Sequence, residues 1–351
     1  MEPTISKNLF DYATSELSQD AFLCWLAANW DSEDTAIHDS VHDLLLHCIQ
    51  TAHGDDTDER ADTSQKEIQV LDIQRQRRHV DVYLRLRYAN QYYAVIIEDK
   101  TRSSYHDNQL NRYYEELSLS TSDMIIGLYF KPNFVPERKE IENGEKRYVV
   151  MDYRNILSCL KSGSKNAIFR SYRDRLQKRA EHAQEFKSKN VQKWDDDQFC
   201  AFFESTLSDL SKESEVWTGS FGRNDNKNGG RYSMWFGNQR ELGPNHDSFH
   251  LNFETANRNM KGPEDLQTCR IIVRWNGNAT HERRSRRDFD LSQIGRACRS
   301  TNSRFTIMGE LFNTASDRDG NSQKLTDKGL TVKIHDAIKT YQQWCDANVS
   351  K

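Results

Sequence analysis

The stretch HVDVYLRLRYANQYYAVIIEDK, residues 79–100, decides the fold of this chain. Its first half alternates with a period of two, which is typical of a strand with one buried face. The expected buried positions are Val80, Val82, Leu84 and Leu86, and the opposite face carries Asp81, Tyr83, Arg85 and Arg87. A short turn at 89–91 leads into YYAVIIEDK, which is apolar on both faces until its end, as a central strand is. The stretch therefore predicts a hairpin inside a sheet.

Further elements are expected on both sides of this hairpin. Apolar periodicity gives helices at 14–30, 36–52 and 105–119, and strands at 67–74, 124–130 and 147–153. The acidic run at 53–66 reads as an exposed loop. Because a helix joins the strand that ends at Lys100 to the strand at 124–130, these two strands should be parallel. The fold class is therefore α/β, with a mixed sheet flanked by helices.

Three residues of the hairpin form a candidate catalytic group. Asp81 lies near the start of the first strand, and Glu98 and Lys100 close the second. Side chains alternate along a strand, so Glu98 and Lys100 should share a face while Asp99 points away. Phosphodiester hydrolysis needs carboxylates that hold divalent cations and a cation that offsets developing charge. Asp81 and Glu98 are therefore candidate metal ligands, and Lys100 is expected to position the attacking water.

The order VDVYL followed by IIEDK resembles the D…ExK signature of the PD-(D/E)xK nuclease superfamily. Gln109 and Tyr113 follow as QxxxY, which resembles a motif of RecB-like and lambda-exonuclease-like members. Residues four apart share a helix face, so both can point into the same cleft. Val80 stands where the superfamily's name has proline.

A second resemblance concerns a group of uncharacterised bacterial members. TSELSQDAFLCWL, residues 14–26, is similar to their first helix, whose glutamate, here Glu16, contributes to the acidic site. The HxNQLxRY arrangement at 106–113 is similar to the same group. A purely structural role stays open for two of these residues. Glu16 is also an acid in the first turn of a helix, where the helix dipole favours negative charge. Tyr113 is also interpretable as an aromatic residue of the core.

The resemblance covers roughly residues 8–160 and implies a restriction-endonuclease-like core. It implies a nuclease that uses magnesium or manganese, held by Asp81, Glu98 and Glu16, with DNA as the expected substrate, in defence, repair or restriction. Two alternatives are a nucleic-acid-binding protein that kept the fold without turnover, and an effector gated by a C-terminal sensor.

Nucleic acid requires local positive charge, because the chain as a whole carries a formal charge of -4. The densest basic cluster is Arg283, Arg284, Arg286 and Arg287. Arginine binds phosphate through two parallel hydrogen bonds, although such a run is also an ordinary solvated loop. Arg78, in the basic run at 75–78 before the first hairpin strand, is a further candidate for the substrate path.

The 351 residues suggest more than one domain. We expect a nuclease core at 1–162, a charged helical connector at 163–215 and a C-terminal α+β domain rich in antiparallel strands at 216–351. The seven cysteines are scattered without a CxxC pair, which favours buried thiols in a reducing cytoplasm. Neither a secretory signal nor a membrane span is expected. A homo-oligomer is left open.

Overall fold

The structure is a computed structural model that describes most, but not all, of the chain. The described residues are 8–53, 67–77, 79–100, 109–135, 138–142, 144, 148–213, 221–224, 231–242, 247–255, 269–276, 294, 305–314 and 325–348. The chain divides into two compact units, Met1–Glu181 and His182–Lys351. The boundary falls within the helical stretch predicted at 163–215, and the three-part division expected from the sequence stays a prediction.

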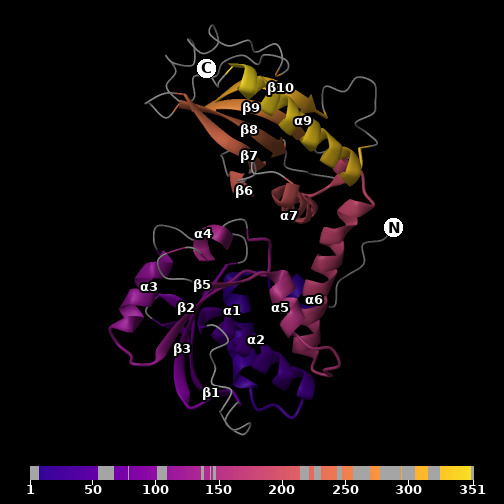
Figure 1. Cartoon of the computed structure of the whole chain (residues 1–351). Helices are drawn as coiled ribbons and strands as arrows, with labels where there is room; N and C mark the ends of the chain where they lie inside the picture. Colours follow the sequence, from indigo (N-terminus) through magenta and orange to yellow (C-terminus); the bar gives the residue numbers. More distant parts are fainter. Residues whose placement is uncertain are drawn as a thin grey trace. The chain divides into compact units, whose positions relative to one another are not determined.

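The first unit is a five-stranded sheet with helices on both faces (Figure 1). Its strands, in their order across the sheet, are β1 (Gln69–Arg77), β2 (Val80–Tyr88), β3 (Gln91–Asp99), β4 (Met124–Phe130) and β5 (Tyr148–Met151). Its helices are η1 (Leu9–Asp11), α1 (Glu16–Ala28), α2 (Thr35–His53), α3 (Gln109–Ser118), α4 (Arg138–Glu142), α5 (Tyr153–Cys159) and α6 (Ala167–Gln184), the last of which crosses the unit boundary. β1, β2 and β3 pair antiparallel, and β3, β4 and β5 pair parallel. The mixed sheet predicted from the sequence is confirmed.

The β2–β3 hairpin is closed by a two-residue turn. Ala89 and Asn90 have positive φ angles of 48° and 62°. Turns with two positive φ angles follow the natural twist of a hairpin and fix its register. Tyr88 therefore pairs with Gln91, and the ladder continues to the pair Val82 and Ile97. This register brings the start of β2 beside the end of β3.

Helix α3 is fixed against one face of the sheet. Its buried residues Leu110, Tyr113 and Leu117 belong to a cluster that includes Ile96 of β3. The Tyr148 hydroxyl at the start of β5 donates to the backbone oxygen of Leu110 at 2.8 Å. Helices α1 and α2 pack on the opposite face, which Figure 1 shows on the other side of the strands from α3.

One expectation for the first unit needs correction. Val80, expected on the face of Val82, packs in the cluster of Tyr83 instead, directly after the left-handed residue His79 (φ 71°). Helix α6, in the stretch expected as a charged helical connector, has a buried face that includes Phe169 and Tyr172. The first residues of the helix predicted at 105–119, up to residue 108, and the loop at 54–66 lie outside the described residues.

The second unit is an antiparallel sheet with helices on one face. The strand order is β10 (Phe305–Asn313), β9 (Cys269–Asn276), β8 (Asp247–Thr255), β7 (Arg231–Leu242) and β6 (Phe221–Asn224). The helical elements are η3 (Glu185–Lys187), η4 (Val191–Lys193), α7 (Asp196–Glu213) and α9 (Asp327–Asn348). Phe253 of β8 contacts Phe203 of α7 with ring centroids 4.7 Å apart, and Phe249 contacts Trp344 of α9 at 4.9 Å. In the described part of the chain, no helix has the length and apolar character needed to cross a membrane.

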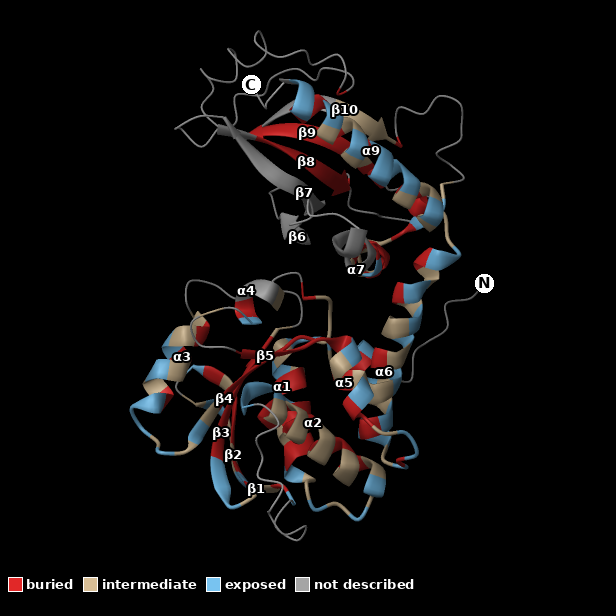
Figure 2. Cartoon of the chain, in the orientation of Figure 1, coloured by how far each residue is buried: buried red, intermediate tan, exposed pale blue. Residues whose placement is uncertain are grey.

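The opposite face of this second sheet carries buried charge. Glu254 is 1% exposed and accepts hydrogen bonds from Arg270 at 2.9 Å and from Asn252 at 2.9 Å. Arg274 also forms an ion pair with Glu254. Strands β8 and β9 are buried along much of their described length (Figure 2). One carboxylate therefore pairs with two guanidinium groups inside the unit.

We predict that Glu254→Gln destabilises the second unit by about 3 kcal/mol, because removing one partner of a buried ion pair leaves uncompensated charge. The measurement is chemical unfolding followed by a probe of the second unit. Exposed Asp346→Asn is the matched control and should leave the midpoint in place. Equal stability of the two variants would contradict this interpretation of the network.

Candidate active site

The end of the β2–β3 hairpin brings two acidic residues together. The antiparallel register ends at the pair Val82 and Ile97, and Asp81 and Glu98 are the next residues of the two strands. The charge of Asp81 raises the pKa of Glu98, which places the two carboxylates within electrostatic range of each other. Lys100 follows the strand and forms an ion pair with Glu98. The three residues selected from the sequence are therefore adjacent.

Glu98 is held on one side of its carboxylate. Its side chain is 1% exposed, and its Oε1 atom accepts a hydrogen bond from the Nε2 of Gln109 at 2.8 Å. Its Oε2 atom is buried and has no hydrogen-bond partner among the described residues. Burial and the charge of Asp81 raise the pKa of Glu98 to about 7, against the opposing effect of Lys100. One carboxylate oxygen is thus fixed, and the other is available to a ligand.

The QxxxY pair positions this glutamate. Gln109 donates through Nε2 to Glu98 and to the Tyr113 hydroxyl, both at 2.8 Å. Tyr113 is 6% exposed, so its ring also belongs to the core below α3. Tyr113 is therefore a core aromatic whose hydroxyl meets Gln109, and its role in catalysis stays a prediction. The likeness of the pair to the RecB-like motif stays a prediction.

Asp81 is anchored by the backbone of the neighbouring strand. Its Oδ2 atom accepts a hydrogen bond from the backbone nitrogen of Asp99 at 2.8 Å. Burial raises the pKa of Asp81, while that hydrogen bond and the charge of Lys100 lower it. Burial also lowers the pKa of Lys100, but Glu98 outweighs it, so the pKa is raised and the ammonium is retained.

A second acidic pair, which the sequence reasoning missed, lies on the α1 face. Asp99 is fully buried and accepts a hydrogen bond from Gln19 of α1. Asp20, 1% exposed, is the acidic neighbour of Asp99. Burial and then Asp20 raise the pKa of Asp99 to about 9, and burial and then Asp81 raise that of Asp20 to about 6. The available signal was helical spacing, because Gln19 and Asp20 follow Glu16 by one turn.

Glu16 lies at the first turn of α1, after the N-cap residue Ser15. Its charge raises the pKa of Glu98, Asp81 and Asp99, in each case as the smallest contribution. The structure therefore places Glu16 within electrostatic range of the acids, at a helix terminus that also favours a negative charge.

The arrangement of two acids and a lysine at the end of a strand is consistent with the family to which the sequence is matched. Residues 7–188, just over half of the chain, match the family model of the PD-(D/E)XK nuclease superfamily. The chain belongs to this superfamily. Its mixed sheet with flanking helices is consistent with the restriction-endonuclease-like fold of that superfamily. The chain has no significant match to a curated protein or to a solved structure.

Nucleases of this superfamily generally use divalent metals. In the described ranges, no group of three or more His, Cys, Asp or Glu side chains is arranged as a metal site. The donor set that fits is the pair Asp81 and Glu98, because the Oε2 of Glu98 is buried without a partner. Hard divalent cations prefer such carboxylate oxygens, and a bound cation would favour the ionised form of both groups, whose pKa values burial raises.

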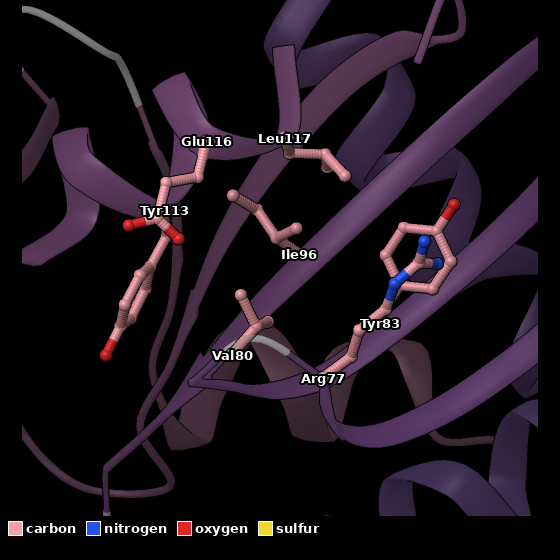
Figure 3. A pocket seen from close by; sticks show the side chains of 7 residues that line it. All are labelled: Arg77, Val80, Tyr83, Ile96, Tyr113, Glu116 and Leu117. Carbon is pink, nitrogen blue, oxygen red and sulfur yellow. The ribbon is translucent and has the colours of Figure 1, made fainter. Parts of the chain in front are cut away.

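A small apolar pocket shares Tyr113 with this candidate site (Figure 3). It is lined by Arg77, Val80, Tyr83, Ile96, Tyr113, Glu116 and Leu117. The Arg77 guanidinium lies 4.4 Å from the centre of the Tyr83 ring. Tyr113 is shared between the pocket and the hydrogen-bond chain to Glu98.

The arginines expected to bind nucleic acid lie outside the described residues. These are Arg78, Arg283, Arg284, Arg286 and Arg287. Their assignment to the nuclease's substrate path stays a prediction.

We predict that Asp99→Asn stabilises the first unit at pH 8. A carboxyl group whose pKa is higher in the folded state favours folding at low pH, and that contribution is lost as pH rises through the folded pKa. With values of about 9 for Asp99 and about 6 for Asp20, unfolding free energy should fall between pH 4 and pH 9. An amide stays neutral, so we expect a flatter profile and a gain on the order of 1 kcal/mol at pH 8.

The measurement is urea unfolding across this pH range in chelator. Asp152→Asn is the contrasting control, since Arg154 and Arg138 outweigh burial and lower the pKa of Asp152. That change should destabilise the protein at pH 8. If both variants changed the unfolding free energy at pH 8 in the same direction, the opposite pKa shifts of Asp99 and Asp152 would not explain their stabilities.

We predict that Gln109→Ala lowers turnover about tenfold to a hundredfold, and that Tyr113→Phe lowers it less. Gln109 contacts Glu98 directly, whereas the tyrosine hydroxyl acts through the glutamine. Steady-state kinetics on labelled nucleic acid is the measurement, with Gln177→Ala on the exposed part of α6 as the control. Unchanged kinetics in both site variants would make QxxxY a purely structural helix face.

Proposed function

We propose that this chain is a magnesium- or manganese-dependent nuclease that hydrolyses the phosphodiester bonds of DNA. The observation that supports it best is the convergence of Asp81, Glu98 and Lys100 at one end of the hairpin. Membership of the superfamily implies nuclease-type hydrolysis, and it supports a nucleic-acid substrate. DNA, a role in defence, repair or restriction, and a place in the cytoplasm are parts of the proposal.

Each residue has a distinct task in this proposal. Asp81 and Glu98 hold the divalent cation, which when bound supplies positive charge to the phosphate and acidifies water. Lys100 holds the attacking water and offsets charge that develops on the phosphate oxygens. Gln109 and Tyr113 keep the Glu98 carboxylate in one orientation.

The protonation state of Glu98 makes cation binding depend on pH. Its pKa of about 7 means that the group is partly protonated at neutral pH before a cation arrives. A cation must displace that proton, since only the carboxylate is a good ligand. Lys100 keeps its charge throughout, because Glu98 raises its pKa. The arrangement therefore favours metal-bound substrate complexes at neutral and mildly alkaline pH.

We predict that Asp81→Ala, Glu98→Ala and Lys100→Ala each reduce cleavage by at least a thousandfold while the fold persists. Groups that act as a unit lose nearly the whole effect when one is removed. The measurement is incubation of single- and double-stranded DNA and RNA with magnesium or manganese, with chelator as the blank. Asp99→Asn, which faces α1, is the matched control and should retain cleavage.

Two results would contradict the proposal. Full cleavage in chelator would exclude the metal mechanism. Binding of nucleic acid without cleavage by the wild-type chain under any metal would favour the alternative of a non-catalytic binding protein.

A further inference from the structure

Two arginines lie over tyrosine rings that line the pocket in Figure 3. Arg77, the last residue of β1, has its guanidinium 4.4 Å from the centre of the Tyr83 ring. The guanidinium of Arg112, on α3, lies 5.3 Å from the centre of the Tyr113 ring. Both tyrosines belong to the lining of this one pocket (Figure 3). The pocket therefore has one arginine on its rings from β1 and another from α3.

The two arginines are connected to the acid pair through short series of residues. The Tyr113 hydroxyl accepts a hydrogen bond from Gln109, which also donates to Glu98, both at 2.8 Å. In the β1–β2 register, Arg77 pairs with the residue that directly precedes Asp81. The ring that carries the second arginine thus contacts the support of one acid. The first arginine lies one ladder position from the other acid.

The N–H donors of these two guanidinium groups are open. Among the described residues, neither Arg77 nor Arg112 forms an ion pair or a side-chain hydrogen bond. A guanidinium that stacks on a ring keeps its donors in its own plane, and the cation–π attraction helps to hold it in place. Arg85 makes a contrast, because it lies 5.1 Å from the centre of the Tyr92 ring but also pairs with Asp123 at 2.7 Å.

The exposure and charge of this region fit an anionic ligand. Arg112 is exposed and Arg77 is half-buried, so solvent and ligands can reach both. Glu116 lines the same pocket and is half-buried, which leaves one net positive charge on these three side chains. Lys100 of the catalytic group is already paired with Glu98. A polyanionic strand needs cations beyond the catalytic group, and arginine binds phosphate through two parallel hydrogen bonds.

We propose that Arg77 and Arg112 bind backbone phosphates of the nucleic acid that flank the scissile phosphate. This inference rests on the nuclease function proposed above. Such contacts fix the position and orientation of a strand without reading its sequence. Tyr83 and Tyr113 then serve as supports that hold the two guanidinium groups toward the strand. Loss of either arginine should therefore affect affinity more than turnover.

The test uses the full chain and a labelled DNA strand. Dissociation constants are measured in calcium across a salt series, and KM and kcat in magnesium. We expect Arg77→Met and Arg112→Met each to weaken binding about threefold to tenfold and to lower the salt slope by about 0.7–0.9, with KM rising more than kcat falls. The double variant should lose the product of the two effects, because separate phosphates contribute independently. Arg112→Lys should keep the salt slope, since it keeps the charge.

Two further variants separate charge from general damage to the pocket. Arg85→Met removes an arginine that also lies over a tyrosine ring but is paired with Asp123, and it should bind as wild type does. Glu116→Gln removes the negative charge of the same pocket, and it should strengthen binding. Damage to the packing of the pocket would weaken binding in this variant as well.

Three results would overturn the proposal. If the wild type binds and cleaves while both arginine variants keep its affinity and salt slope, these arginines contact no phosphate. If the variants bind more weakly with an unchanged salt slope, the arginines stabilise the pocket by packing alone. If the wild type neither binds nor cleaves any nucleic acid, the proposed function itself fails, which is distinct from the first two results.

Discussion

The alternation of side chains along β3 separates two adjacent acidic residues, and the rest of the site depends on that separation. Glu98 faces α3, where Lys100 and Gln109 contact it, while Asp99 faces α1 and contacts Gln19. Neighbours in the chain therefore belong to different environments. The ladder with β2 and β4 fixes this arrangement, because a shift of one residue would exchange the two faces.

The two environments give the acids different chemistry. Glu98 has a lysine partner and a pKa of about 7, so a cation can replace its proton at neutral pH. Asp99 has a second acid, Asp20, as its neighbour, and its pKa of about 9 keeps it protonated under the same conditions. A protonated carboxyl beside the site adds no negative charge to it. Asp99 is thus a neutral group on the α1 face at neutral pH, while Asp81, Glu98 and Lys100 act on the other face.

Much of the first unit could be predicted because its signals are local. The period of two, the turn at Ala89 and Asn90 and the crossover helix specify the hairpin and the parallel pair. The place of Glu98 beside Lys100 follows from the same alternation. Asp20 and Asp99 could not be identified as partners, since they meet only through the packing of α1 on the sheet. Val80 departed from its predicted face directly after the left-handed residue His79, whose conformation no local pattern indicates.

The central claim is that Asp81 and Glu98, but not Asp99, hold a divalent cation. Calorimetric titration of manganese into the wild type, Glu98→Gln and Asp99→Asn at pH 7.5 tests it without reference to a substrate. We predict that the wild type and Asp99→Asn bind manganese with similar affinity and that Glu98→Gln loses at least tenfold. Retention of wild-type affinity by Glu98→Gln, or its loss in Asp99→Asn, would contradict the assignment of the two faces.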